Sequence, residues 1–167
     1  MSITISESGM LFGEYCEADL FQMEKSSVYA ALGDGVSTVE FVLRRKGDEI
    51  LFIEAKQSTP HPDNPEDFDT FIDEVYCKFA HSVDIFFSLV TKRLEDKDNE
   101  MPIYFKTTDY SLPAIKLLLV INGHEIKWLP PVLHALRRKL IRIIKTWRLD
   151  IAVLNNEQAL EYGLIKC

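Results

Sequence analysis

The sequence lacks the features that define several classes of protein. No stretch approaches the ~20 consecutive apolar residues of a membrane-spanning helix, and the N-terminus has no basic start followed by an apolar run. The three cysteines are far apart and form neither a disulfide framework nor a CxxC pair, and the four histidines show no zinc-binding spacing. We therefore expect a cytoplasmic protein that uses no membrane, disulfide or zinc.

An excess of basic residues is also missing, because the net charge is −7 at pH 7. Nucleic acids attract basic surfaces through the release of phosphate counterions, so the molecule as a whole has no such attraction. The charges are unevenly spread: residues 63–74 and 95–100 are acidic, while residues 137–148 are basic. The length of 167 residues and the 47% hydrophobic content predict a single folded domain, residues 1–167.

Apolar periodicity predicts a chain in which strands and helices are mixed. A compact apolar run at 114–121 is typical of a strand that is covered on both faces. The other elements that we predict are extended segments near 10–15 and 21–24, helices at 24–32, at 68 to about 94 and at 129–147, a strand at 150–154, and a helical turn at 157–162.

Two further strands, predicted at 38–46 and 50–56, form a hairpin that carries the most informative residues. In the first strand Val39, Phe41 and Leu43 alternate with Glu40, Val42 and Arg44, which predicts that the first set faces the core and the second set a cleft or solvent. In the second strand, Glu54 and Lys56 close an apolar run. Their spacing of two residues places them on the same face of the strand.

The length of the hairpin loop decides whether Glu40 joins these two residues, because opposed residues in an antiparallel pair share a face. A two-residue turn would oppose Glu40 to Ala55, on the wrong face. A three-residue loop at 47–49 would bring Glu40 opposite Lys56 and diagonal to Glu54, within side-chain reach. We predict an odd-length loop or a bulge.

An acid on one strand, followed by Glu54-Ala55-Lys56 at the end of its hairpin partner, resembles the PD-(D/E)XK nuclease superfamily. The resemblance covers about residues 24–121, with 129–167 as a C-terminal helix-strand extension. It implies an α/β (α+β), restriction-endonuclease-like fold with a central mixed sheet of about four to five strands flanked by helices. One departure from the family pattern is that Glu40 follows Val39 and replaces the commoner Pro-Asp.

The resemblance implies a metal-dependent nuclease that hydrolyses DNA phosphodiester bonds, with Mg²⁺ or Mn²⁺ as cofactor. Carboxylate oxygens suit these hard cations. Lys56 would position the attacking water and stabilise the charge of the transition state. The implied catalytic residues are Glu40, Glu54 and Lys56, and the implied metal ligands are Glu40, Glu54, the Ala55 carbonyl and Glu24 on the first predicted helix.

DNA is the implied substrate, in phage defence, restriction, mobile-element or repair. A homodimer or a larger complex with a targeting partner would supply the choice of target. Arg138, Arg142 and Lys145 lie along one stripe of the helix at 129–147 and are candidate phosphate contacts, as is Lys78.

Each of these features also has a plain structural explanation, which the sequence leaves open. Glu54 and Lys56 can form an exposed ion pair on an edge strand, and Glu24 can serve only the dipole of its helix. Lys78 can lie on a solvated helix flank, and the basic stripe can be the solvated face of an amphipathic helix. A second hypothesis is therefore a catalytically inactive nuclease-fold subunit that binds protein or nucleic acid, which the net acidity favours.

Overall fold

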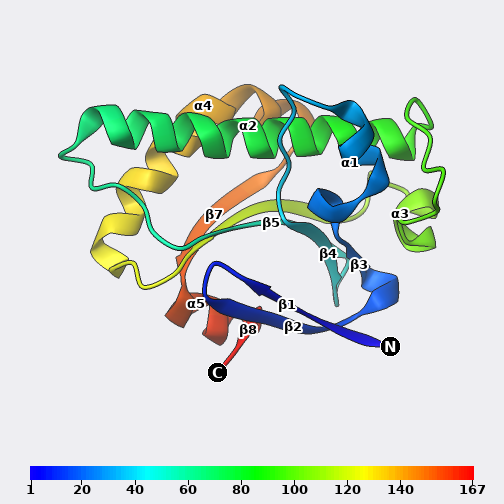
Figure 1. Cartoon of the computed structure of the whole chain (residues 1–167), viewed down its shortest axis with the longest axis horizontal. Helices are drawn as coiled ribbons and strands as arrows, with labels where there is room; N and C mark the ends of the chain where they lie inside the picture. The colour runs from blue at the N-terminus through cyan, green and yellow to red at the C-terminus, as the bar shows by residue number, and fades with distance from the viewer.

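The computed structural model describes residues 1–167 as a mixed α/β fold built on a five-stranded sheet (Figure 1). The strands in spatial order are β3 (Leu20–Phe21), β4 (Phe41–Arg45), β5 (Glu49–Lys56), β6 (Ala114–Ile121) and β7 (Asp150–Asn155). β3, β4 and β5 are antiparallel neighbours, whereas β5, β6 and β7 run parallel. The predicted mixed sheet with flanking helices is confirmed at this level.

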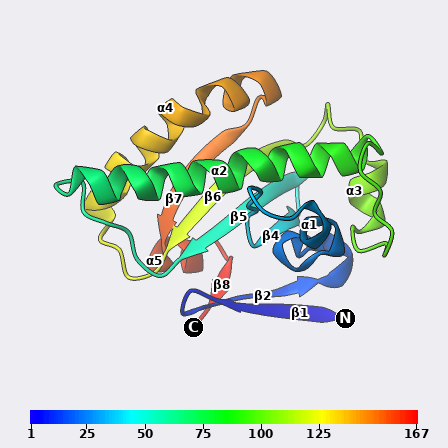
Figure 2. The same ribbon diagram turned by 45° about the horizontal axis from the view of Figure 1, so that its top comes forward.

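Two long helices, α2 (Pro65–Val90) and α4 (Leu129–Trp147), cover one face of this sheet and pack against each other (Figure 2). α2 begins earlier than predicted, because Pro65 is tolerated in the first turn and the acids that follow it complement the helix dipole. The buried stripe of α2 consists of Ile72, Val75, Phe79, Val83 and Phe86. It packs against inward residues of the sheet, which are Phe52 of β5 and Leu117 and Leu119 of β6. None of the helices is both long enough and apolar enough to cross a lipid bilayer.

The other face of the five-stranded sheet packs against a three-stranded sheet and the short helix α5 (Asn156–Glu161) (Figure 1). The strands of this second sheet are β1 (Ser2–Glu7), β2 (Met10–Cys16) and β8 (Ile165–Lys166). Both faces of β5 and β6 are therefore covered, which explains their nearly continuous apolar sequences. The sequence does not predict this layer, since β8 is only two residues long and pairs with a distant strand.

The remaining elements are short. They are η1 (Glu17–Asp19), η2 (Met23–Lys25), α1 (Ser27–Leu32), α3 (Ile103–Thr107) and η3 (Ile126–Trp128). The predicted helix at 24–32 is divided, because Ser26 ends η2 and its side chain caps the N-terminus of α1 by accepting a hydrogen bond from the Tyr29 amide. Glu24 therefore lies in η2 and not on the first α-helix.

The hairpin between β4 and β5 has a three-residue loop at 46–48, since Arg45 pairs with Glu49. The predicted odd parity is confirmed, but the predicted position of the loop at 47–49 is wrong by one residue. Continuing the register past the last pair places Glu40 opposite Glu54, and not opposite Lys56.

The prediction for the faces of β4 is wrong in part, because the strand begins only at Phe41. Phe41 and Leu43 pack toward the three-stranded sheet, but Val39 packs with Val42 in the layer beneath the helices. Val42 is fully buried and faces neither a cleft nor solvent. A strand with two covered faces has no solvent side, so alternation alone does not indicate which face is the core.

Candidate functional site

Four elements bring three acids and a lysine together between the five-stranded sheet and α2. Glu54 lies near the end of β5, Glu40 directly precedes β4, Glu24 lies in η2 and Lys78 lies on α2. The amide of Glu24 donates a hydrogen bond to the Glu40 carbonyl at 3.4 Å, which fixes η2 beside the start of β4. Residues distant in the sequence thus form a single cluster.

Strand alternation explains why Glu54 points toward α2. Phe52, two residues earlier on β5, packs in the layer beneath the helices, and Glu54 shares its face. Ala55 packs in the opposite layer with its side chain toward the three-stranded sheet. β5 is hydrogen-bonded to both β4 and β6, so the predicted alternative of an exposed ion pair on an edge strand is excluded.

Lys78 occupies the centre of the cluster. Its Nζ atom lies 2.9 Å from Oε1 of Glu54, and 3.9 Å from Oε1 of both Glu40 and Glu24. Only 14% of its side chain is exposed, so the predicted alternative of a solvated helix flank is wrong. The sequence does not indicate this role, because the rotation of α2 over the sheet decides which of its polar residues meet the strands.

Lys56 lies at the edge of the same cluster, where it bridges two acids. Its Nζ atom is 3.5 Å from Oε1 of Glu54 and 2.6 Å from Oε1 of Glu74 on α2. Glu74 is half exposed and is absent from the residues that the sequence predicts for the site. The signal that could have found it is helical spacing, since Glu74 precedes Lys78 by four residues on the same face of α2.

Glu54 is fully buried, and the charged groups beside its carboxylate are the ammoniums of Lys78, at 2.9 Å, and Lys56, at 3.5 Å. Burial raises the pKa of Glu54 to about 7, although the charges of Lys78 and Lys56 oppose this rise. Burying a carboxylate is costly, and an acid whose pKa is shifted by burial and by charged neighbours is a candidate functional group.

The pKa of Glu40 is raised further than the pKa of Glu54. Burial raises the pKa of Glu40 to about 9, and the neighbouring carboxyls of Glu24 and Glu54 add to the rise. Glu40 therefore holds a proton at neutral pH. Burial alone would favour neutral Lys78, but its contacts with the neighbouring acids, above all Glu54, outweigh burial and raise the pKa of Lys78, so the ammonium stays charged.

Glu24, Glu40 and Glu54 supply carboxylate oxygens, which are the ligands that a hard divalent cation prefers. In the present arrangement, however, no three Asp, Glu, His or Cys side chains converge on one metal position. The three acids surround the Lys78 ammonium, which takes the place at their centre. The proposed carbonyl ligand of Ala55 remains a prediction.

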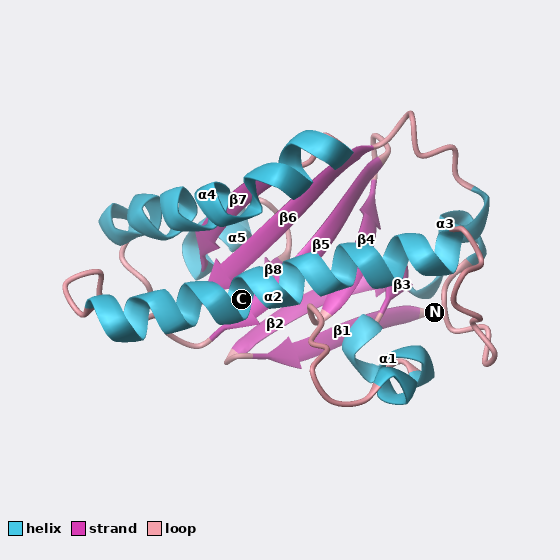
Figure 3. Ribbon diagram, turned by 90° about the horizontal axis from the view of Figure 1, so that it is seen from above, coloured by secondary structure: helices cyan, strands magenta, loops and turns pink.

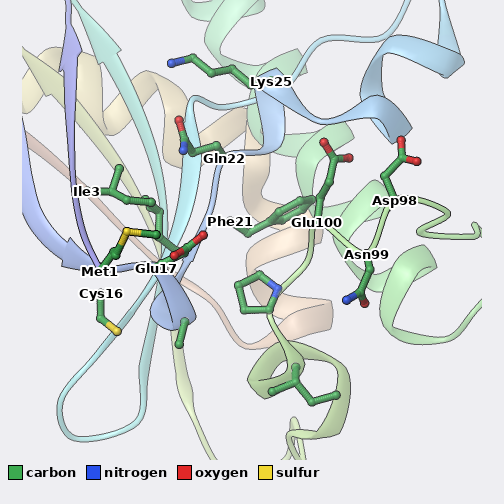
Figure 4. Close-up of a pocket in the computed structure, with 14 residues that line it drawn as sticks. Met1, Ile3, Cys16, Glu17, Phe21, Gln22, Lys25, Asp98, Asn99 and Glu100 are labelled. Carbon is green, nitrogen blue, oxygen red and sulfur yellow. The ribbon is translucent and has the colours of Figure 1, made fainter.

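A surface hollow with a volume of about 650 Å³ lies beside this cluster and not over it. Figure 4 shows its lining, which includes Gln22 and Lys25 from the segment around Glu24, and residues 98–100 from the connection between α2 and α3. None of the main hollows is lined by Glu40, Glu54 or Lys78.

The basic stripe lies away from the carboxylates. Arg138, Arg142 and Lys145 are exposed on α4, which lies on the opposite side of α2 from α1 and its neighbouring segment η2 (Figure 3). The structure therefore brings Lys78 to the cluster but leaves these three residues outside it.

No protein-family model matches the chain, and comparison with curated proteins and with solved structures finds no match either.

Proposed function

We propose that the protein is a metal-dependent nuclease of the PD-(D/E)XK type, with a restriction-endonuclease-like fold, that hydrolyses DNA phosphodiester bonds. The observation that carries this proposal is Glu54, a fully buried acid on a central strand with Glu40 beside it and Lys56 two residues further along the strand. A purely structural residue would not need a carboxylate at this position, because an apolar side chain there avoids the desolvation cost.

In this proposal Glu40, Glu54, the Ala55 carbonyl and Glu24 hold Mg²⁺ or Mn²⁺. Such a cation neutralises phosphate charge and promotes ionisation of water. Lys56 remains at the edge of the cluster, where its ammonium lies 3.5 Å from Oε1 of Glu54. From there it positions the attacking water and stabilises the negative charge that develops on the phosphate oxygens.

DNA binding in this proposal depends on local charge and on partners, since the net charge is −7. Arg138, Arg142 and Lys145 would contact phosphates away from the cleaved bond, because α4 is separated from the carboxylates by α2. A homodimer or a complex with a targeting partner, in the cytoplasm, would supply further contacts.

Metal-dependent cleavage of plasmid DNA tests the proposal. Glu54→Ala and Lys56→Ala should each abolish nicking in Mg²⁺ or Mn²⁺. The chain contains a matched control, since Glu125 and Lys127 have the same spacing and form an exposed ion pair at 2.7 Å. Glu125→Ala and Lys127→Ala should retain full activity, and full activity in both cluster variants would refute the nuclease proposal.

A second candidate is the catalytically inactive nuclease-fold subunit, acting as a protein- or nucleic-acid-binding module. The position of Lys78 favours it, because an ammonium among the three acids neutralises them without any metal. Calorimetry with Mn²⁺ separates the candidates. Absence of binding, or binding that is unaffected by Glu40→Gln, would favour the inactive subunit over the nuclease.

A further inference from the structure

Lys78 is the only side chain that contacts all three acids of the cluster. We propose that its ammonium is a resident counter-cation, and that a divalent cation binds by displacing it from Glu24, Glu40 and Glu54. This inference rests on the metal-dependent function proposed above, since it describes how that site is opened. It makes metal loading an exchange of cations and not the filling of an empty site.

The distances around Lys78 support the exchange. The ammonium lies 2.9 Å from Oε1 of Glu54, the one fully buried carboxylate of the cluster. Mg²⁺ demands ligands at about 2.0–2.1 Å in near-octahedral order, so the acids would have to close around the point that Lys78 now occupies. Two cations in contact with the same carboxylate would also repel each other strongly in a site with little water.

Glu74 offers the displaced ammonium a new partner. It lies four residues before Lys78 on the same helix, a spacing at which Glu and Lys side chains pair, and it is half exposed. Its present partner is Lys56, at 2.6 Å. Movement of Lys78 to Glu74 would therefore release Lys56 from that acid and leave it free to face water and phosphate.

The affinity of the protein for Mn²⁺, measured by calorimetry at neutral pH, tests this exchange. Lys78→Met should bind Mn²⁺ about tenfold more tightly than the wild type, because no resident cation has to leave. Lys25→Met is the matched control: Lys25 is exposed, follows Glu24 directly and forms no ion pair with the cluster. It should change the affinity less than about twofold, since it removes the same charge without removing a competitor.

Equal or weaker binding by Lys78→Met would overturn the inference, because an ordinary supporting residue weakens a site when it is removed. The nuclease proposal is judged separately. Wild-type cleavage together with unimproved binding refutes the exchange alone, whereas tight binding by Lys78→Met without wild-type cleavage supports the exchange and refutes the nuclease. Absence of Mn²⁺ binding in both proteins refutes both.

A measurement on the wild type covers the case in which Lys78→Met does not fold. Acetylation of lysines by an activated acetate ester, followed by mass spectrometry of peptides, reports the accessibility of each ammonium. Lys78 should react slowly without metal and several-fold faster in saturating Mn²⁺, while exposed Lys25 should react equally in both conditions. A Lys78 rate that Mn²⁺ leaves unchanged would overturn the inference.

Discussion

Replacing Glu40 with Gln should stabilise the protein in mildly alkaline solution. Burial and two neighbouring acids raise the pKa of Glu40 to about 9 in the folded state, against a usual value of 4.5. The folded state therefore binds a proton that the unfolded chain has already lost, and the free energy of unfolding falls as the pH rises from 4.5 to about 9. Gln does not ionise, so the variant lacks this fall.

The magnitude follows from the linkage between protonation and folding. Each proton held only by the folded state changes the free energy of unfolding by about 1.4 kcal/mol per pH unit, which would amount to several kcal/mol at about pH 8. Glu40 is 10% exposed and lies 3.9 Å from the Lys78 ammonium, so water and the lysine screen part of this cost. We expect a gain of about 2 kcal/mol for Glu40→Gln at about pH 8, and almost none near pH 5.

Urea denaturation of the wild type and Glu40→Gln at both pH values measures this difference. Glu125→Gln serves as a control, because Glu125 is exposed and its pair with Lys127 lowers the pKa of its carboxyl, so it should show no gain at high pH. If Glu40→Gln is no more stable than the wild type at about pH 8, Glu40 is ionised and favourably paired in the folded state. The carboxyl of Glu40 would then not be held protonated by burial and its neighbouring acids.

Three other substitutions test the fold and the surface. Phe86→Ala should lower the free energy of unfolding by about 3–5 kcal/mol in urea denaturation, because Phe86 is fully buried among Phe52, Phe87, Phe105 and Tyr110; a loss below 1 kcal/mol would contradict this packing. Ser26→Ala should cost about 1 kcal/mol in the same assay, because it removes the cap of α1, and equal stability would contradict that role. Charge reversal at Arg138 and Arg142 should reduce the dependence of DNA affinity on salt concentration. An unchanged slope of affinity against salt would show that neither residue contacts DNA phosphates.

The sequence predicts those helices and strands whose type and limits are set by neighbouring residues in the chain. The run at β6 is apolar throughout and lies between Pro113 and Asn122-Gly123, so both its type and its limits are readable. α4 is equally clear, because two prolines mark its first turn and its apolar residues recur at helical spacing. The odd length of the hairpin loop has no such local signal. Its prediction rests on the hypothesis that Glu40 and Glu54 share a face, which only that parity allows, and the register confirms it.

The remaining features depend on contacts between distant residues. The partners of β2 are β1 and the two-residue β8, from the other end of the chain, and no pattern within either segment specifies that pairing. The predicted layer of Val39 is wrong for a related reason. The residue at which β4 begins depends on the segments that pack beside it and not on the alternation of apolar and polar residues. Lys78 is the most consequential case, since only the docking of α2 on the sheet brings it to Glu54.

The charges of the cluster explain how Lys78 can belong to a functional site. With Glu40 protonated, the carboxylates of Glu24, Glu54 and Glu74 face the ammoniums of Lys78 and Lys56, so one negative charge is left over. If a divalent cation replaces Lys78, Lys78 moves to Glu74 and Glu40 loses its proton, four carboxylates are balanced by the metal and the two ammoniums, and the cluster is neutral. The exchange therefore leaves no uncompensated charge in a buried place, which is the state that costs most. A lysine among acids is thus compatible with a metal site, provided that the lysine has another acid to meet, and on α2 that acid is Glu74.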